Sequence, residues 1–360
     1  MARPTKATMN LSAFSHNYRL AKSLSPQSKA IAVVKADAYG HGVIEMAKSL
    51  ANEADAFGVA CIEEALELRE SGIVQPILLL EGFFSEDELP LINQHDFWCA
   101  VHSDAQIEAL ARQPKSDQYN VWLKFDSGMH RLGFSENEYQ QAYDKLNALP
   151  QVKNIVLMTH FACADELSST MNQQQFSLCM KTFAHINAPV SMANSAATLH
   201  DDKYRLDYLR PGIMLYGASP FPDAHFNGDK LKPVMTLSSE VIAIRQVAAG
   251  ESIGYGQRFV CDKSMTIGTV AIGYADGYPR HAKDGTPMMV DGHRTKLVGR
   301  VSMDMLMVDL TNIPNAKVGS SVELWGDHIL AAEVAYYSDT IPYTLFTGIT
   351  RRVKKEYISL

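Results

Sequence analysis

A lysine at the end of a predicted buried strand is the first candidate for chemistry in this sequence. Lys35 closes the apolar run 30–34 and is followed by a turn that contains Gly40 and Gly42. An amine at the mouth of a buried strand is poorly hydrated, which favours the neutral form that acts as a nucleophile or base. Tyr39 adds a phenol where the backbone turns. An ordinary strand that ends in an exposed lysine has the same local pattern. Residues elsewhere in the chain are therefore needed to distinguish a reactive lysine from an ordinary one.

More polar residues follow other apolar runs. Singly, each fits an ordinary structural role: Ser195 fits the start of a helix, and Lys124 can extend along an amphipathic strand to solvent. In a barrel of parallel strands, however, the C-terminal strand ends meet on one face, where chemistry takes place. The sequence therefore predicts one polar site that contains Lys35, Lys124, Arg131, His160, Asn194, Ser195, Arg210 and Gly212.

These residue types suit a pyridoxal phosphate site. A lysine can form an imine, Ser195 and the backbone at Gly212 can bind a phosphate, and His160 can lie against an aromatic ring. A phosphosugar lyase with a Schiff-base lysine needs similar groups, so both interpretations stay open at this point. The residue that faces the pyridine nitrogen decides much of the chemistry: an aspartate deepens the electron sink, whereas an arginine weakens it and limits side reactions.

Short apolar runs alternate with longer amphipathic segments from about residue 30 to 216. Parallel strands need long crossovers, so the alternation predicts an α/β fold. Eight strands are the number that a (β/α)₈ barrel needs, and a doubly wound sheet is the alternative. The predicted strands span 30–34, 56–61, 77–80, 97–101, 121–125, 155–160, 190–192 and a run within 206–216. The predicted helices span 43–52, 62–71, 86–93, 104–112, 135–149 and 165–187.

The pattern changes after about residue 230, where turn dipeptides separate short β-rich runs. This predicts a mainly antiparallel β domain, interrupted by one helix near 330–337. We expect residues 1–10 to add a strand to it. The predicted domains are thus a barrel over 11–230 and a β domain over 231–360 plus 1–10. The predicted strands of the β domain span 235–247, 265–272, 287–290, 295–298, 305–308 and 321–324.

Composition narrows the classes of function. The 360-residue chain has a formal net charge of −7 and an isoelectric point near 5.9, so it lacks the basic surplus that binds nucleic acid. It shows neither a signal peptide nor an apolar run that spans a bilayer, which predicts a cytoplasmic protein without a membrane partner. The five cysteines are widely spaced, and no Cys-x-x-Cys occurs. Reduced thiols and no metal site are therefore expected.

The segment 32–42, AVVKADAYGHG, is similar to the cofactor-lysine signature of alanine racemases, which are fold-type III pyridoxal phosphate enzymes. The sequence as a whole resembles this family in order along nearly its full length. Jointly these motifs are highly specific. The other segments that carry the resemblance are 124–133, 159–165, 193–197, 210–212, 254–256, 273–277, 299–304 and 341–343.

The resemblance implies a racemase with two bases. Lys35 would hold pyridoxal phosphate and act on the D side of the substrate, and Tyr255 from the other subunit of a homodimer would act on the L side. Interconversion of L- and D-alanine requires two such groups, since one removes the proton that the other returns. Arg210 would face the pyridine nitrogen. The implied cofactor-binding residues are Lys35, Tyr39, His160, Asn194, Ser195, Arg210, Gly212, Ile213 and Tyr343.

The resemblance also implies how substrate binds. Arg131 and the backbone N–H of Met303 would bind the carboxylate of the substrate. Lys124 matches a lysine that is carbamylated in many members, which would turn a cation into an anion that fixes Arg131. The residues that would line the access path are Asp165, Tyr274 and Arg280.

Two positions depart from the family pattern. Ser302 stands where many members have cysteine, beside Met303. Ser191 stands where some members have a histidine that supports the arginine at 210. The sequence does not show which group orients Arg210.

Two other functions share parts of this pattern. A broad-specificity amino-acid racemase has a wider pocket, but such relatives are typically exported. A pyridoxal-phosphate-binding homeostasis protein has a similar barrel and lysine but generally lacks the β domain, so Tyr255, Met303 and Tyr343 argue against it. The predicted function is racemisation of alanine, which would supply D-alanine for peptidoglycan or serve alanine catabolism.

Overall fold

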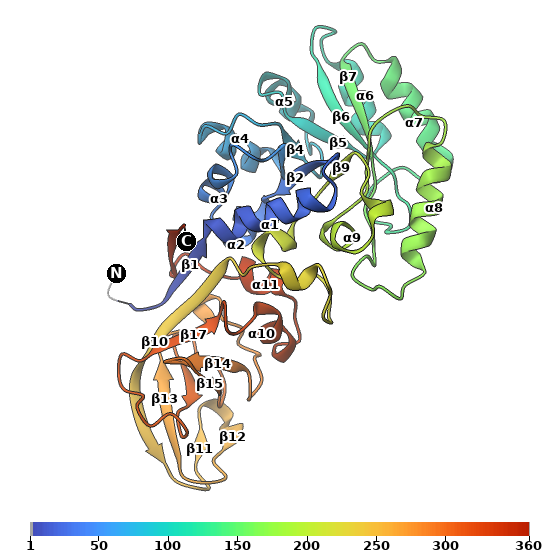
Figure 1. Ribbon diagram of the computed structural model, residues 1–360. Helices are drawn as coiled ribbons and strands as arrows, with labels where there is room; N and C mark the ends of the chain where they lie inside the picture. The colour runs from blue at the N-terminus through green and yellow to red at the C-terminus, as the bar shows by residue number, and fades with distance from the viewer. Residues whose placement is uncertain (1–2, 360) are drawn as a thin grey trace.

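The computed structural model describes residues 3–359 and shows a barrel joined to a β domain (Figure 1). Eight parallel strands close the barrel in sequence order, and β9 pairs with β2. The predicted (β/α)₈ barrel is therefore confirmed, and the doubly wound alternative is wrong. The barrel strands are β2 (Lys29–Val33), β3 (Ala56–Val59), β4 (Ile77–Leu79), β5 (Trp98–Val101), β6 (Tyr119–Lys124), β7 (Val152–Met158), β8 (Val190–Ser191) and β9 (Tyr208–Leu209).

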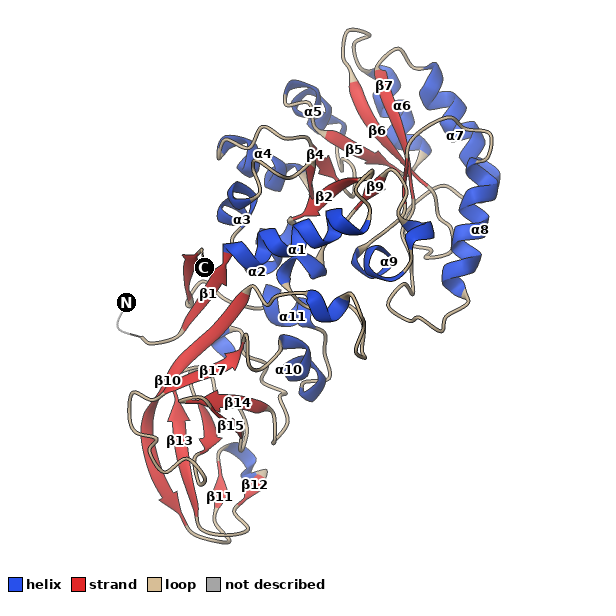
Figure 2. Ribbon diagram, in the orientation of Figure 1, coloured by secondary structure: helices blue, strands red, loops and turns tan. Residues whose placement is uncertain are grey.

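Helices cover the outside of the barrel (Figure 2). Strand β6 shows the effect: all six of its residues are buried, because helices cover one face and barrel side chains fill the other. The helices of this domain are α1 (Leu11–Leu24), α2 (Lys35–Gly40), α3 (Val43–Ser49), α4 (Ile62–Glu70), α5 (Leu89–Gln94), α6 (Asp104–Arg112), α7 (Glu136–Ala148), α8 (Met171–Phe183) and α9 (Ser195–His200). Short 3₁₀ helices are η1 (Glu86–Glu88), η2 (Asp202–Tyr204), η3 (Ile213–Tyr216) and η4 (Gly228–Lys230).

The last barrel strand is shorter than predicted. The run within 206–216 forms only the two residues of β9 and then, after a break, η3. Pro211 lies in this break, and it has no N–H to donate to a ladder, although its carbonyl still accepts a hydrogen bond from Val33 at 3.0 Å. The chain therefore leaves the barrel at Arg210 and Gly212, two of the predicted site residues.

The second domain is built on an eight-stranded sheet. Apart from the parallel pair of β1 and β18, its described strands pair antiparallel. The two ends of the chain thus meet in this sheet, beside β10. The boundary predicted after residue 230 falls between η4 and β10 and stays a prediction. The strands are β1 (Lys6–Asn10), β10 (Met235–Val247), β13 (Met265–Val270), β14 (Pro287–Val290), β15 (His293–Lys296), β16 (Leu306–Asp309), β17 (Ser321–Trp325) and β18 (Lys354–Ile358).

Smaller elements complete the β domain. A two-stranded ribbon of β11 (Ser252–Ile253) and β12 (Phe259–Val260) encloses the 3₁₀ helix η5 (Tyr255–Gln257). A further 3₁₀ helix, η6 (Tyr274–Asp276), follows β13. Helix α10 (Ala331–Tyr337) lies where one helix was predicted, and α11 (Pro342–Thr347) follows it.

No helix within residues 3–359 is both long and apolar enough to cross a bilayer. The same range holds no group of three or more His, Cys, Asp or Glu residues that could bind a metal, and the five cysteines are free thiols.

Candidate active site

Lys35 begins a strained turn at the C-terminal end of β2. Residues 36–39 of α2 have φ of 51–55° and ψ of 42–53°, which is a left-handed conformation. For L-residues this conformation costs roughly 1–2 kcal/mol each, and it persists only where the surroundings fix it. Backbone strain of this kind concentrates at functional sites, so the turn itself marks Lys35 as unusual.

Side chains from both domains fix this turn. Glu64 of α4 accepts a hydrogen bond from the backbone of the turn at 2.7 Å. Asp37 pairs with Lys355 of β18, with 2.5 Å between Oδ2 and Nζ. A Cβ atom on Gly40 would lie 2.2 Å from the carbonyl oxygen of Phe346, so α11 packs directly on the turn. The β domain therefore helps to hold the lysine at the mouth of the barrel.

Four predicted phosphate-binding residues meet beside the turn. The rings of Tyr39 and Tyr343 lie 5.7 Å apart, and a Cβ atom on Gly212 would lie 2.7 Å from the Tyr39 hydroxyl. The Ser195 hydroxyl accepts a hydrogen bond from the Gly212 N–H at 2.8 Å, which leaves its own proton free to donate. Burial raises the pKa of Tyr343 to about 12 and raises that of Tyr39, so both phenols remain donors at neutral pH. This cradle needs glycine at 212.

Asn194 and Ile213 flank the cradle. Asn194 caps α9, since its side-chain oxygen accepts the N–H of Ala197 at 3.0 Å. Ile213 is the first residue of η3 and is buried. Asn194 thus fixes the start of the helix whose first residue is Ser195, and its role in the site is structural.

Arg210 is buried under the barrel mouth, and the structure shows what orients it. One guanidinium nitrogen bonds to the Ser191 hydroxyl, and the other donates to the carbonyl of Thr159 at 2.6 Å and to His160 Nδ1 at 3.3 Å. The carbonyl of Met192 also accepts, at 3.3 Å. Ser191 therefore takes the supporting position that the sequence left open.

Arg210 and His160 carry different charges at neutral pH. Burial lowers the pKa of Arg210 to about 9, which still leaves the guanidinium largely protonated. Enclosure by the protein, reinforced by the cations Arg210, Arg131, Lys124 and Lys35, holds the pKa of His160 well below its usual range. The His160 ring is thus neutral, and because its Nδ1 accepts from Arg210, its proton is on Nε2.

Lys124 ends β6 and lies among these cations. Burial, followed by the charges of Arg210 and Arg131, lowers the pKa of the Lys124 amine to about 8. Lys124, Arg131 and His160 line one small cavity. No carboxylate partner for Arg131 is found within residues 3–359. Cations gathered this closely make the site receptive to anions.

Three of the predicted residues lie on the β domain. Met303 and Tyr274 belong to adjacent loops, because the Tyr274 N–H donates to the Ser302 carbonyl at 3.0 Å. Arg280 lies over the Tyr274 ring, 5.9 Å from its centroid. In the part of the chain that the structure describes, the Met303 N–H has no hydrogen-bond acceptor. It is free to bind an anion.

The predicted residues thus form two groups. One group lies at the barrel mouth and consists of Lys35, the phosphate-binding residues around Gly212, Arg210 and Lys124. Asp165 also lies there, close enough to Tyr343 for its charge to raise the pKa of that phenol. Tyr255 lies in η5, between the β11 and β12 strands that Figure 1 shows at the end of the β domain farthest from the barrel. Its side chain is 70% exposed. One chain alone therefore does not bring Tyr255 to Lys35.

Sequence reasoning missed several residues that support the site. Glu64 and Lys355 hold the turn, and Thr159 holds Arg210 through a contact between segments far apart in the chain. Only Thr159 gave a signal, because it lies inside a motif beside His160. The other contacts depend on tertiary structure that the local sequence does not encode.

Comparison with known proteins agrees with this geometry. Residues 9–220 match the alanine racemase N-terminal domain, and residues 234–357 match its C-terminal domain. A catabolic alanine racemase from Pseudomonas putida is 52% identical over 356 residues, which cover 99% of each chain. The solved biosynthetic alanine racemase of Pseudomonas aeruginosa is 46% identical, with a TM-score of 0.96 and 99% of each chain covered.

A solved structure that contains the cofactor is also similar. The alanine racemase of Bartonella henselae, with covalently bound pyridoxal phosphate, is 30% identical and has a TM-score of 0.91. The match covers 99% of this chain and 100% of the Bartonella chain. Domain matches, sequence identity and fold all agree along the length of the chain, and the protein therefore belongs to the alanine racemase family of isomerases.

Proposed function

We propose that this protein interconverts L- and D-alanine with pyridoxal phosphate, as a homodimer whose active sites each use both chains. The observation that carries the proposal is the assembly at the barrel mouth: Lys35 on its strained turn, Arg210 held by four groups, and the Tyr39–Gly212 cradle. The full-length similarity to alanine racemases supports the same reaction.

The residues present fit pyridoxal phosphate. The space that Gly212 leaves beside the Tyr39 hydroxyl would be filled by a Cβ atom, and donors from Ser195 and Tyr343 suit a phosphate. Lys35 would bind the aldehyde carbon, and Arg210 would donate to the ring nitrogen and leave it without a proton. When bound, the cofactor withdraws electrons from the substrate and makes its Cα proton acidic.

The two bases act from opposite faces of the substrate. The Lys35 amine would move the proton at Cα on the D side, and the Tyr255 phenol of the partner subunit would move it on the L side. The exposure of Tyr255 at the tip of the β domain supports this division between two chains. The substrate carboxylate would bind the Arg131 guanidinium and the free Met303 N–H.

We further propose that Lys124 carries a carbamate. Its neutral amine attacks CO₂, an N–C bond forms, one amine proton leaves to solvent, and the product is an anion beside Arg131. Because the pKa of the amine is about 8, the reactive fraction rises as the pH increases through that value. At constant CO₂ pressure, ¹³C NMR with labelled CO₂ should show a carbamate signal that grows over this range.

Two variants make the carbamate experiment specific. Lys124→Met should remove the signal, whereas Lys153→Met, which removes an exposed lysine of β7, should leave it unchanged. A wild-type protein without any carbamate signal at pH values above 8 would overturn the assignment.

The reaction itself is tested by the purified protein and a panel of L-amino acids, with formation of each D-enantiomer measured. We expect alanine to be the preferred substrate by about tenfold or more over larger side chains, the order of discrimination that a few methylenes allow. Comparable rates across the panel would indicate a broad-specificity racemase instead. Bound cofactor without any racemisation would indicate a homeostasis protein.

Alanine racemases similar to this chain include one named catabolic and one named biosynthetic. We propose a cytoplasmic enzyme that supplies D-alanine for peptidoglycan or serves alanine catabolism. Growth of a strain that lacks this protein, on minimal medium with and without D-alanine, separates these roles: dependence on D-alanine indicates biosynthesis.

A further inference from the structure

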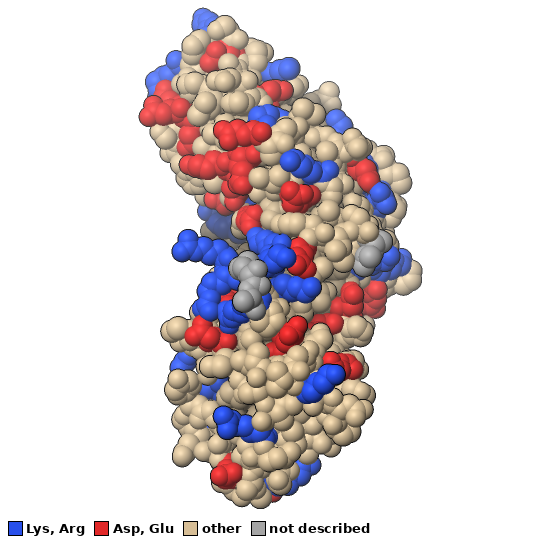
Figure 3. Space-filling model, turned by 90° about the vertical axis from the view of Figure 1, so that its left-hand side faces the viewer, with Lys and Arg blue, Asp and Glu red and all other residues tan. Residues whose placement is uncertain are grey.

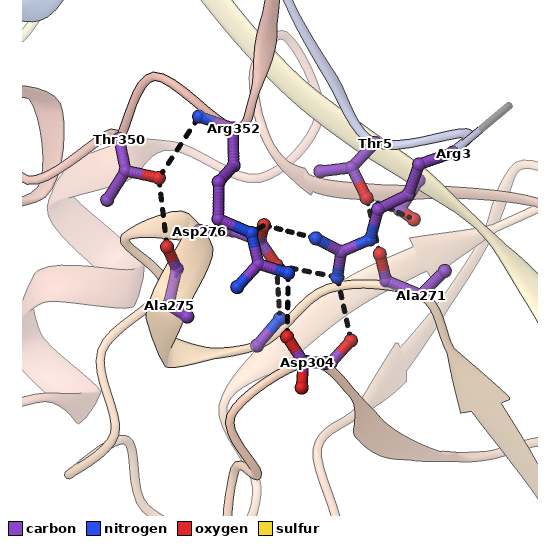
Figure 4. A network of polar contacts seen from close by, with 10 residues as sticks. Arg3, Thr5, Ala271, Ala275, Asp276, Asp304, Thr350 and Arg352 are labelled. Carbon is purple, nitrogen blue, oxygen red and sulfur yellow. Dashed lines mark hydrogen bonds and ion pairs between the residues drawn. The ribbon is translucent and has the colours of Figure 1, made fainter. Parts of the chain in front are cut away.

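A buried carboxylate outside the catalytic groups links the two ends of the chain. Asp276, the last residue of η6, is fully buried. Both of its oxygens accept from the Arg3 guanidinium, at 2.5 and 2.8 Å, and the Gly273 N–H donates to it at 2.9 Å. Arg352 approaches the same carboxylate to 3.5 Å (Figure 4). A carboxylate so deeply buried is stable only when its charge is paired in this way.

The same two arginines also hold a second loop. Arg3 donates to the backbone carbonyl of Asp304 at 2.8 Å, and Arg352 pairs with the Asp304 side chain at 2.6 Å. In Figure 3, lysines and arginines gather at the waist of the molecule. Arg3 and Arg352 thus bridge the loop of Asp276 and the loop of Asp304.

These two loops carry Tyr274 and Met303. The Ala275 N–H donates to the Met303 carbonyl at 3.0 Å, which places the two loops in direct contact. A Cβ atom on Gly273 would lie 2.4 Å from that carbonyl oxygen, so no side chain fits between them. On the opposite side, the Thr350 N–H donates to the Asp276 carbonyl at 3.1 Å. The backbone at Met303 is therefore held by hydrogen bonds to the loop that carries Asp276.

The free Met303 N–H depends on this arrangement. Its direction is set by the peptide plane between Ser302 and Met303. The carbonyl of that plane, which is that of Ser302, accepts from the Tyr274 N–H, and the next carbonyl, that of Met303, accepts from the Ala275 N–H. A shift of the Asp276 loop would therefore turn the Met303 N–H as well. Positioning of a binding group to within about 0.5 Å commonly needs a supporting layer of this kind.

We propose that Asp276, Arg3 and Arg352 form a positioning network that fixes the Met303 N–H and the Tyr274 ring for the substrate. This inference rests on the proposed function, in which Met303 binds the substrate carboxylate. None of the three charged residues touches the reacting atoms. Their effect is on how tightly substrate binds, because the Met303 contact is made in the ground state and in the transition state alike.

Arg3→Met is the main test, since the Arg3 side chain is 28% exposed and its loss does not open the core. We expect KM for alanine to rise about tenfold with kcat changed less than about twofold, the pattern of lost uniform binding. Arg3→Lys should recover part of this loss, because it restores the charge without the two-pronged geometry. The folded fraction of an Asp276→Asn variant should likewise show a raised KM with a nearly unchanged kcat.

A matched control lies nearby in the chain, at the start of β1. Lys6→Met removes a cation three residues further along, whose partner is the surface carboxylate of Glu356 at 3.1 Å, and it should leave KM unchanged. A purely structural role for Arg3 predicts a lower Tm and fewer active molecules with an unchanged KM, and that result would overturn the inference. Wild-type protein that does not racemise alanine would instead defeat the proposed function, so the two failures are distinct.

Discussion

Replacing Lys35 by alanine is expected to remove both alanine racemisation and the visible absorbance of the lysine-bound cofactor. In the mechanism we propose, the variant loses both the group that attaches the cofactor and one of the two bases. A positioned base alone contributes up to about 10⁴-fold, so the activity should fall by at least that factor. The absorbance spectrum measures the first effect, and a coupled assay for D-alanine measures the second.

The strand that precedes Lys35 supplies its control. Lys29 begins β2, at the opposite end of the barrel, where its amine lies 5.7 Å from the Tyr208 ring centroid. Lys29→Ala should keep the absorbance and nearly all of the activity. Near-ultraviolet circular dichroism should show that Lys35→Ala keeps its fold, because Lys35 is only partly buried. Activity retained in Lys35→Ala would remove this lysine from the mechanism.

The barrel could be predicted because its strands are recognisable in the sequence as short apolar runs. Runs such as 77–80 are apolar throughout, since a parallel strand is covered on both faces. The eighth strand was overpredicted for the same reason: Ile213–Tyr216 is equally apolar and buried but forms η3, and burial alone does not separate a strand from a helix. Helix α1 was missed although Asn10 caps it and Phe14 and Tyr18 lie one turn apart.

The site was predictable where it depends on strand ends and not where it depends on contacts between distant segments. Because active sites of such barrels lie at the C-terminal strand ends, Lys35, Lys124 and Arg210 could be predicted to lie at one mouth of the barrel. The left-handed turn at 36–39 was not foreseen, because non-glycine residues adopt it only when the surrounding structure compels them. Its supports come from α4, α11 and β18, and the sequence does not reveal which of their residues reach it.

Tyr255 is the residue whose proposed role depends most on a second chain. It is 70% exposed, and it lies at the end of the β domain remote from the barrel (Figure 1). A phenol in that position cannot act on a substrate held by Lys35 of the same chain. Met303, 52% exposed, faces the same requirement. Both become useful only if the β domain of one chain meets the barrel of another, as in a closed symmetric dimer.

Removal of the Tyr255 hydroxyl should affect the two enantiomers unequally. In Tyr255→Phe, exchange of the α-proton of D-alanine with deuterated water continues through Lys35, whereas exchange from L-alanine should fall by roughly 10²–10⁴-fold. NMR of each enantiomer measures these rates separately. Tyr336→Phe, which changes another exposed tyrosine of the β domain, is the control and should leave both rates unchanged. Equal loss for both enantiomers would argue against a base at Tyr255.

A heterodimer of Lys35→Ala and Tyr255→Phe chains tests whether the site is shared. When the two chains carry different affinity tags and the mixed dimer is purified, one of its two sites combines an intact Lys35 with an intact Tyr255. Such a dimer should recover about half of the wild-type activity, although each parent is nearly inactive. If each chain contained a complete site, every site in the mixed dimer would lack one base, and the activity would stay at the level of the parents. The opposite predictions arise because Lys35 and Tyr255 lie in different domains of one chain.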